Sequence, residues 1–297
     1  MNFNEKFEYY KNMVDKELES IFSSCDLLQK SVYEAMQYSV LAGGKRIRPV
    51  LILAAADMLG GSLDDAKKVA VSLECIHTYS LIHDDLPCMD DDDLRRGLLT
   101  CHKKFGEATA LLAGDGLLTF AFENLSDFEG YKTASAETVL KITNYIAKSS
   151  GTKGMIGGQV VDLESEGRGD LDEYTLSYIH ERKTGALIRV SVVAGALIAG
   201  ASEEEVNALS DFAQKIGLAF QIQDDILDFT GDEMTLGKPI GSDKENEKIT
   251  YVTLMGIEKA EEKASHLTKS ALESLNIFGQ KADFLKELAK ALLKRNN

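Results

Sequence analysis

The chain has 297 residues, of which 44% are hydrophobic and 27% charged. It is long enough to bury a large core, and its composition is that of a folded protein and not of a disordered one. Its 48 acidic and 33 basic residues give a net charge of −15, which argues against non-specific binding to nucleic acid and to anionic membranes. Four cysteines without C-x-x-C spacing favour reduced thiols in a cytoplasmic protein, and the longest apolar stretch, residues 190–199, is shorter than the roughly 20 residues that cross a bilayer.

Apolar residues at spacings of three and four predict helices along nearly the whole chain. Strand signals are scarce, no repeat is visible and no Pro/Ser-rich linker divides the sequence. We therefore expect an all-α fold, a bundle of long helices in a single domain over residues 1–297, with a mobile lid over residues 230–247. The expected helices cover residues 7–18, 32–41, 46–59, 64–82, 107–124, 134–148, 152–163, 171–198 and 203–229, and two more within 248–294 that separate near 276–279.

The first acidic cluster follows the fourth of these helices and contains Asp84, Asp85 and Asp90. Pro87 is expected to loosen the helix, so that Asp90 bends back toward the same ion as Asp84. Carboxylate oxygens without soft ligands select Mg²⁺ or Ca²⁺. Taken alone, such a run is more often a solvated acidic loop.

A second cluster, Asp224, Asp225 and Asp228, lies at the end of the helix expected over residues 203–229. Asp224 and Asp228 are one turn apart on one face, with their Cβ atoms about 6 Å from each other. Their repulsion costs a helix a few tenths of a kcal/mol unless a cation lies between them. Two such motifs at helix ends favour metal binding over a solvated surface.

Several basic groups accompany the carboxylates, and the Gly43–Pro49 segment, Gly-Gly-Lys-Arg-Ile-Arg-Pro, carries three of them. Its spacing is not that of a P-loop, and a basic helix terminus explains it equally well when it is considered alone. Arg95, Arg96 and Lys183 add positive charge near the acidic motifs. Carboxylates, a divalent metal and separate cations together indicate a site for phosphorylated substrates, and no nucleophile motif is present.

These residues resemble a known family. Gly43–Pro49, the aspartate-rich run through Arg95-Arg96-Gly97, Lys183-Thr184-Gly185, Phe220-Gln221 and Asp224–Asp228 are similar, in order and spacing, to the motifs of the short-chain trans-polyprenyl diphosphate synthases. The resemblance is nearest to the bacterial farnesyl diphosphate synthases (geranyltranstransferases). It implies helices around a central cavity, the isoprenoid synthase fold. It also implies a Mg²⁺-dependent condensation of isopentenyl diphosphate with dimethylallyl and then geranyl diphosphate.

The resemblance also implies a role for each motif residue. About three Mg²⁺ ions per site would be held by Asp84, Asp85, Asp90, Asp224, Asp225 and Asp228. Catalytic roles fall on Asp84, Asp90, Asp224 and Lys183. The allylic diphosphate would contact Arg95, Lys183, Thr184, Gln221, Lys238 and Lys248, and isopentenyl diphosphate would contact Lys45, Arg48, His77 and Arg96. A homodimer without membrane insertion is expected.

Product length depends on the residues just before the first cluster. In relatives with the long form of this motif, an aromatic residue at the position of Tyr79 resembles a stop for a farnesyl product, although Ser80 is nearer Asp84 on the helical wheel. A geranylgeranyl or geranyl diphosphate synthase is the nearest alternative, and a terpene cyclase would not need the Gly43–Pro49 segment. From a different class, the chain could be a non-catalytic regulatory subunit or an acidic divalent-ion buffer.

Overall fold

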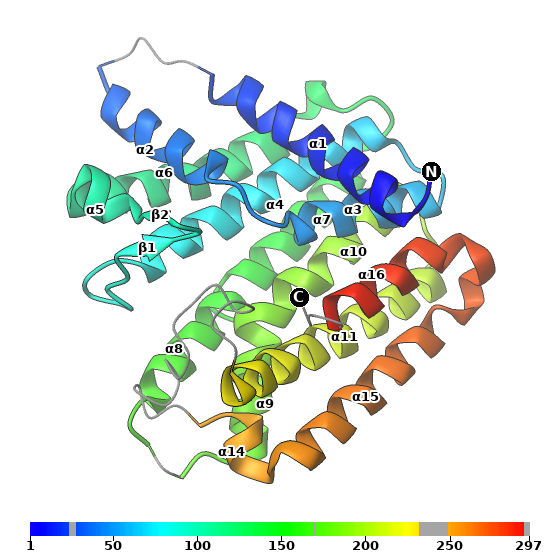
Figure 1. Cartoon of the computed structure of the whole chain (residues 1–297). Helices are drawn as coiled ribbons and strands as arrows, with labels where there is room; N and C mark the ends of the chain where they lie inside the picture. The colour runs from blue at the N-terminus through cyan, green and yellow to red at the C-terminus, as the bar shows by residue number, and fades with distance from the viewer. Residues whose placement is uncertain (24–27, 169, 232–248, 294–297) are drawn as a thin grey trace. The chain divides into compact units, whose positions relative to one another are not determined.

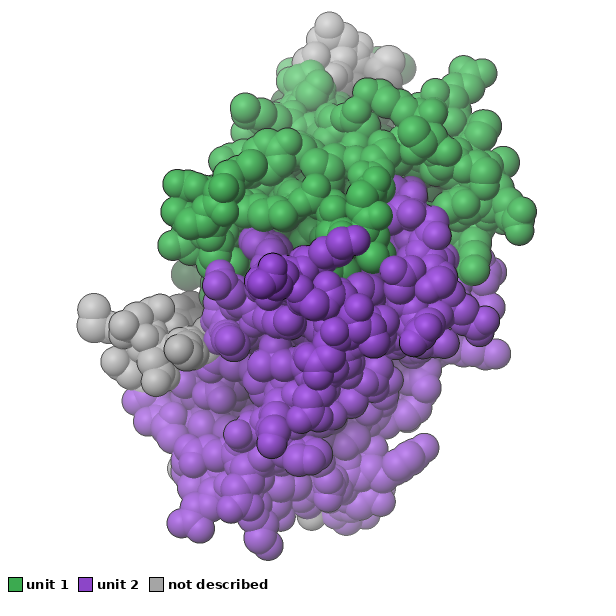
Figure 2. Space-filling model, turned by 90° about the vertical axis from the view of Figure 1, so that its right-hand side faces the viewer, with its two compact units in different colours: residues 1–143 green, residues 144–297 purple. Residues whose placement is uncertain are grey.

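The computed structural model describes residues 1–23, 28–168, 170–231 and 249–293 (Figure 1). Nearly all of the described elements are helices, which confirms the all-α prediction. The chain divides into two compact units, residues 1–143 and 144–297, which Figure 2 shows in different colours. A single domain around one central cavity stays a prediction. No helix among the described residues is both long enough and apolar enough to cross a membrane.

The first unit is built around α4 (Leu63–Asp84), which packs against α3 and α6 and carries the first aspartate cluster at its end. Ser62 caps α4, because its hydroxyl accepts the Asp65 N–H at 3.2 Å. The other elements of this unit are α1 (Phe3–Ile21), α2 (Lys30–Leu41), α3 (Ile47–Met58), β1 (Leu94–Arg95), β2 (Leu98–Leu99), α5 (Cys101–Phe105), α6 (Glu107–Ser126) and the 3₁₀ turn η1 (Phe128–Gly130), and α7 (Ala136–Ser150) leads into the second unit.

Buried apolar side chains hold α3, α4 and α6 together. Every residue from Pro49 to Ala56 on α3 is buried, as are the apolar residues of α4 between Val69 and Ile76. α6 approaches α4 closely because Gly114 has no side chain, and a Cβ there would lie 2.1 Å from Nε2 of His83. The end of α4, where the aspartates begin, is therefore fixed by the core of the first unit.

The second unit is organised around α11 (Glu203–Thr230), which packs against α10 and α15 and carries the second aspartate cluster in its last turns. A capping box between Ser202 and Glu205 starts α11, and Gly231, with φ 46°, follows its last residue. The other elements are α8 (Met155–Ser165), α9 (Glu173–His180), the π-helical turn η2 (Glu181–Gly185), α10 (Ala186–Ile198), α14 (Tyr251–Met255), α15 (Ile257–Ser274), the 3₁₀ segment η3 (Asn276–Ala282) and α16 (Asp283–Leu293).

Several local features differ from the sequence predictions, and α5, at Cys101–Phe105, was not among the expected helices. Leu94–Arg95 and Leu98–Leu99 form a short antiparallel hairpin after the aspartates, where no strand was expected. The helix expected over residues 171–198 is interrupted by η2, the turn that carries Lys183. The C-terminal region contains α14, α15 and α16 instead of two helices, because Gly256 with φ 84° separates α14 from α15. The loop expected to act as a lid, residues 230–247, lies almost entirely outside the described residues.

Candidate active site

The first aspartate cluster is shaped by the end of α4. Asp84 is its last residue, Asp85 is the C-cap, and the backbone N–H of Asp90 donates to the carbonyl oxygen of Asp84 at 2.9 Å. The chain therefore turns back after Pro87, as expected, and brings the backbone of Asp90 next to that of Asp84. Asp84 is half-buried and Asp90 is exposed.

Asp85 has a different environment from its neighbours. It is 3% exposed, and Nε of Arg95 donates to its Oδ1 at 2.8 Å. Burial raises the pKa of the Asp85 carboxyl, although the bond from Arg95 acts in the opposite direction. Arg95 also contacts Oδ2 of Asp92 at 3.0 Å. Asp85 thus holds the arginine of the hairpin in place, while Asp84 and Asp90 stay closer to solvent.

Arg48 contacts His77 where α3 and α4 meet. Nη1 of Arg48 is 3.2 Å from Nε2 of His77, and since a guanidinium has only donors, Nε2 accepts and the ring proton is on Nδ1. Burial, followed by the charges of Arg48 and Arg96, holds the pKa of His77 well below its usual value, so the ring is neutral. Within the described residues, the buried Nε of Arg48 has no hydrogen-bond partner. A buried donor of this kind suits an anionic substrate.

Arg96 lies against the Gly43–Pro49 segment. Its Nη1 donates to the Gly43 carbonyl oxygen, and its guanidinium occupies the space beside Gly44, where a Cβ would lie 2.6 Å from the guanidinium carbon. Gly44, with φ 123°, is thus required both by the backbone and by the arginine. Arg96 itself has φ 56°, a strained conformation of the kind found at binding sites.

The other residues predicted in the first unit are also accounted for. Lys45 is exposed and lies between Gly44 and the start of α3. Tyr79 is 6% exposed, and its ring meets that of His83 edge-on at 5.7 Å between centroids. The hydroxyl of Ser80 donates to the carbonyl oxygen of His77 at 2.8 Å. The Tyr79 side chain is therefore buried against its own helix, and the Ser80 hydroxyl is bonded to the backbone of that helix.

In the second unit, Lys183 is paired with a carboxylate that the sequence did not single out. Its Nζ donates to Oδ2 of Asp162 on α8 at 2.7 Å. α8 approaches η2 closely because Gly158 has no side chain, and a Cβ there would lie 2.3 Å from the backbone nitrogen of Lys183. The π-helical turn places Lys183 beside α8, and such turns are frequent at functional sites.

As in the first cluster, one aspartate of the second cluster is buried and the other two are more accessible to solvent. Asp225 is 7% exposed, and its Oδ2 accepts the backbone N–H of Tyr251 at 2.8 Å and lies 3.9 Å from Nε2 of His180. The His180 ring stacks on Tyr251 with centroids 5.6 Å apart, and burial lowers the pKa of His180 to about 4. Asp225 thus links α11 to α14. Asp224 and Asp228, one turn apart on α11, are half-buried.

The remaining predicted residues divide into two groups. Thr184 in η2 and Gln221 on α11 are half-buried. Lys238 and Lys248 lie outside the described residues.

Over residues 1–23, 28–168, 170–231 and 249–293, no three His, Cys, Asp or Glu side chains form a preassembled metal site. The donors of each cluster nevertheless fit Mg²⁺, because Asp84 and Asp90 in the first unit, and Asp224 and Asp228 in the second, offer hard carboxylate oxygens and none of them is fully buried.

Several residues that support the site were not predicted from the sequence. Arg46 is buried and donates to Asp15, Glu74 and the Val40 carbonyl oxygen, so it anchors the segment that carries Lys45 and Arg48. Its position next to Lys45 was the available signal. Nothing in the sequence alone identified Glu74, Asp162 or Tyr251 as partners, because each is defined by a contact between segments far apart in the chain.

Comparison with known proteins shows the family of this chain. Residues 29–291 match the polyprenyl synthetase family. The farnesyl diphosphate synthase of Escherichia coli is 45% identical over 301 residues, covering 100% of both chains. The chloroplastic geranylgeranyl pyrophosphate synthase of Catharanthus roseus is 46% identical over 96% of this chain and 79% of its own length. A structure of the Helicobacter pylori geranyltransferase, complexed with magnesium and isoprenyl diphosphate, has a TM-score of 0.81 at 36% identity and covers 97% of this chain and 96% of its own. The chain therefore belongs to the polyprenyl synthetase family.

Proposed function

We propose that this protein is a Mg²⁺-dependent prenyltransferase that makes farnesyl diphosphate. It joins isopentenyl diphosphate to dimethylallyl diphosphate and then to geranyl diphosphate, and each step releases inorganic diphosphate. The observation that carries this proposal is the 45% identity to the Escherichia coli farnesyl diphosphate synthase over the full length of both chains. The separate cationic and acidic sites agree with it, since the reaction needs two phosphorylated substrates.

Isopentenyl diphosphate is assigned to Arg48, Arg96 and Lys45 of the first unit, with His77 beside them. Arg48 has a buried donor without a partner among the described residues, and Arg96 is fixed beside Gly44. Neutral His77 accepts from Arg48 and so orients its guanidinium without adding charge. Lys45 is exposed in the same segment as Arg48 and adds a further positive charge. These groups bind and orient the nucleophilic substrate.

The allylic substrate is assigned to the two aspartate clusters, with Arg95, Lys183, Thr184, Gln221, Lys238 and Lys248 as further contacts. About three Mg²⁺ ions would be held chiefly by Asp84, Asp90 and Asp224. They would stabilise the negative charge of the departing diphosphate. Lys183, oriented by Asp162, adds positive charge at the same anion. Asp85 bonds to Arg95, and Asp225 bonds to the backbone of Tyr251. Their main effect on the site is therefore to position these neighbours.

The reaction breaks the allylic carbon–oxygen bond and forms a carbon–carbon bond from the isopentenyl double bond. The proton then lost goes to the departing diphosphate, because no described side chain stands out as a base. Helix walls that exclude water would protect the allylic cation from hydrolysis.

A geranylgeranyl diphosphate synthase is the second candidate, since the Catharanthus roseus enzyme is 46% identical. That protein is longer, and the match covers 79% of it, whereas the bacterial farnesyl diphosphate synthase matches end to end.

A homodimer is part of the proposal. It is supported by exposed leucines on α6 and α7, of which Leu111 is 47%, Leu112 53% and Leu140 71% exposed. Light scattering of the purified protein tests the dimer.

The function is tested by incubating the purified protein with isopentenyl and geranyl diphosphates, with and without Mg²⁺, and by chromatography of the products. Farnesyl diphosphate that requires Mg²⁺ is the expected result. Asp84→Ala and Asp224→Ala should each lower turnover by orders of magnitude while the circular dichroism spectrum stays unchanged. Near-normal activity in both variants would refute the metal assignment.

A further inference from the structure

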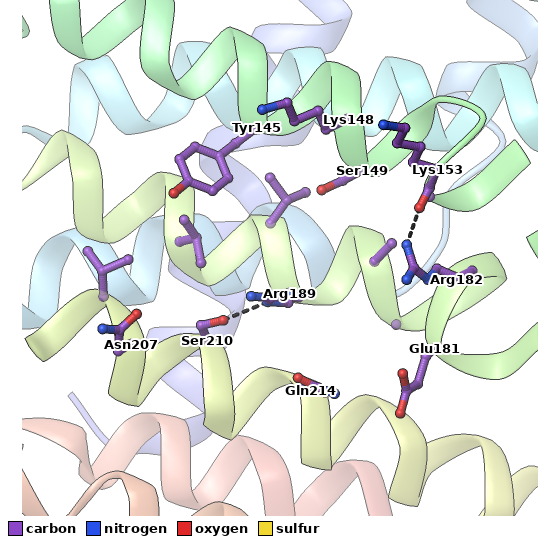
Figure 3. Close-up of a pocket in the computed structure, with 16 residues that line it drawn as sticks. Tyr145, Lys148, Ser149, Lys153, Glu181, Arg182, Arg189, Asn207, Ser210 and Gln214 are labelled. Atoms are coloured by element: carbon purple, nitrogen blue, oxygen red, sulfur yellow. Dashed lines mark hydrogen bonds between the residues drawn. The ribbon is translucent and has the colours of Figure 1, made fainter. Parts of the chain in front are cut away.

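A basic cavity lies inside the second unit, apart from the residues assigned to either substrate. It has a volume of about 390 Å³, within the size range of small-molecule sites, and is lined by the end of α7, the segment before α8, η2, α10 and α11 (Figure 3). Four of its lining residues are cations, Lys148, Lys153, Arg182 and Arg189, and one, Glu181, is an anion. In a protein of net charge −15, this is a local inversion of charge.

The two arginines are held in place by neutral groups. Nε of Arg189 donates to the hydroxyl of Ser210 at 2.6 Å, and Nη1 of Arg182 donates to the carbonyl oxygen of Lys153 (Figure 3). The guanidinium of Arg182 also lies 5.1 Å from the ring centroid of Tyr178. Both guanidinium groups are therefore ordered before any ligand arrives, which lowers the entropy cost of binding.

None of the four cations forms an ion pair with another residue in the described part of the chain. Elsewhere, by contrast, basic side chains such as Lys68, Arg95 and Lys183 are paired with aspartates. Preorganised positive charge without a carboxylate partner is the arrangement that binds phosphate groups. Arg189 is exposed, so a ligand can reach it from solvent.

The lining also has an apolar component, which includes Val190, Val193 and Val206. A ligand with an anionic head and a short hydrocarbon chain could therefore use both parts of the cavity. Neither the aspartate clusters nor Arg48 and His77 contribute to the lining.

We propose that this cavity is a second anion site, which binds a diphosphate group through Arg182, Arg189 and Lys148 without a metal ion. The diphosphate could come from inorganic diphosphate or from a prenyl diphosphate, whose chain would contact the valines. Because η2 contributes both Arg182 to this cavity and Lys183 to the candidate active site, the two sites share one structural element.

The test is calorimetric titration of the full-length protein with inorganic diphosphate in EDTA, which removes metal-dependent binding. The wild-type protein should bind two molecules per chain, one here and one at Arg48 and His77. Arg189→Gln/Lys148→Gln should weaken one of the two by at least about tenfold, since each lost contact is a charge-assisted hydrogen bond. Arg48→Gln should weaken only the other.

A matched control, Lys141→Gln/Lys269→Gln, removes the same charge from two exposed positions outside the cavity and should leave both sites unchanged. Lys148→Gln alone, at an exposed position, serves if the double variant does not fold. A single binding event in the wild-type protein, lost in Arg48→Gln and retained in Arg189→Gln/Lys148→Gln, would overturn the proposal.

Geranyl diphosphate in the same buffer distinguishes the two sources of the anion. Tighter binding than inorganic diphosphate at the Arg189-dependent site assigns the valine wall to a prenyl chain, and equal binding assigns recognition to the diphosphate group alone; both results support the site. Because these titrations measure binding without turnover, their outcome is independent of whether the protein makes farnesyl diphosphate.

Discussion

Arg46 and Glu74 form a buried ion pair between the Gly43–Pro49 segment and α4. Nη1 of Arg46 is 2.7 Å from Oε1 of Glu74, and the two residues are 4% and 1% exposed. Arg46 has φ 51°, a left-handed conformation that is rare for a residue with a side chain. The pair therefore holds in place a strained turn whose neighbours, Lys45 and Arg48, are assigned to substrate.

Loss of Arg46 should destabilise the protein strongly. In Arg46→Leu the Glu74 carboxylate stays buried without its main partner, and breaking a buried pair in this way costs about 3–5 kcal/mol. Urea denaturation of the variant measures this loss. The matched control is Lys30→Ala, which breaks the exposed pair with Glu34 and should cost no more than about 0.5 kcal/mol. Equal effects of the two substitutions would contradict the structural role of Arg46.

The neutral state of His77 predicts how stability changes with pH. Burial, Arg48 and Arg96 hold its pKa well below the ordinary value of 6.5, so the unfolded chain takes up a proton near pH 6.5 that the folded protein does not. Stability from this group is therefore present above pH 6.5 and is lost as the pH falls, by at most about 1.4 kcal/mol per pH unit.

His77→Gln should remove this dependence. Between pH 6.5 and 5, the slope of the unfolding free energy against pH is expected to fall by up to about 1.4 kcal/mol per pH unit, the equivalent of one proton. The exposed Asn144→Gln removes no titratable group and serves as the control, and its slope should match that of the wild-type protein. An unchanged slope in His77→Gln would mean that His77 titrates normally in the folded state.

Much of the fold could be predicted from the sequence, because helical periodicity is a local signal. The helix expected over residues 203–229 is α11, Glu203–Thr230, since its capping box and its following glycine both lie in the local sequence. The hairpin at Leu94 and Leu99 was not predicted, because it has two residues per strand and no alternating pattern. Periodicity also cannot reveal η2, where the hydrogen-bond spacing changes within an otherwise continuous helix.

The charged residues of the candidate site could be proposed from the sequence, whereas contacts between distant segments could not. Asp84 and Asp224 belong to repeated local motifs, so their type and spacing were visible. Asp65, in contrast, is fully buried and accepts the backbone N–H groups of residues 132, 133 and 134, at distances of 2.7 to 3.0 Å. No local pattern distinguishes Asp65 from a helix-capping aspartate at the start of α4, since its partners are 67 or more residues away.

Tyr79 is expected to limit the length of the product. Its ring is buried in α4 against His83, and Tyr79→Ala would open space in that wall. The variant should make products longer than farnesyl diphosphate, as measured by chromatography of the dephosphorylated alcohols. Tyr79→Phe keeps the ring and should keep the product. An unchanged product in Tyr79→Ala would move the stop to another residue.

The contact between α8 and η2 offers a test of the position of Lys183. In Gly158→Ala the new Cβ would lie 2.3 Å from the nitrogen and 2.8 Å from the Cα of Lys183, and because both are backbone atoms, α8 must move away. We expect a loss of about 1–3 kcal/mol in unfolding free energy and a fall in turnover, since Asp162 on α8 orients Lys183. Gly185→Ala is the matched control: its φ is −63°, and outside its own turn a new Cβ would meet, among the described residues, the carbonyl oxygen of His180 at an ordinary 3.4 Å. That variant should stay within about 1 kcal/mol of the wild-type protein. If Gly158→Ala behaved like Gly185→Ala in both denaturation and turnover, close packing of α8 on this turn would not be what positions the lysine.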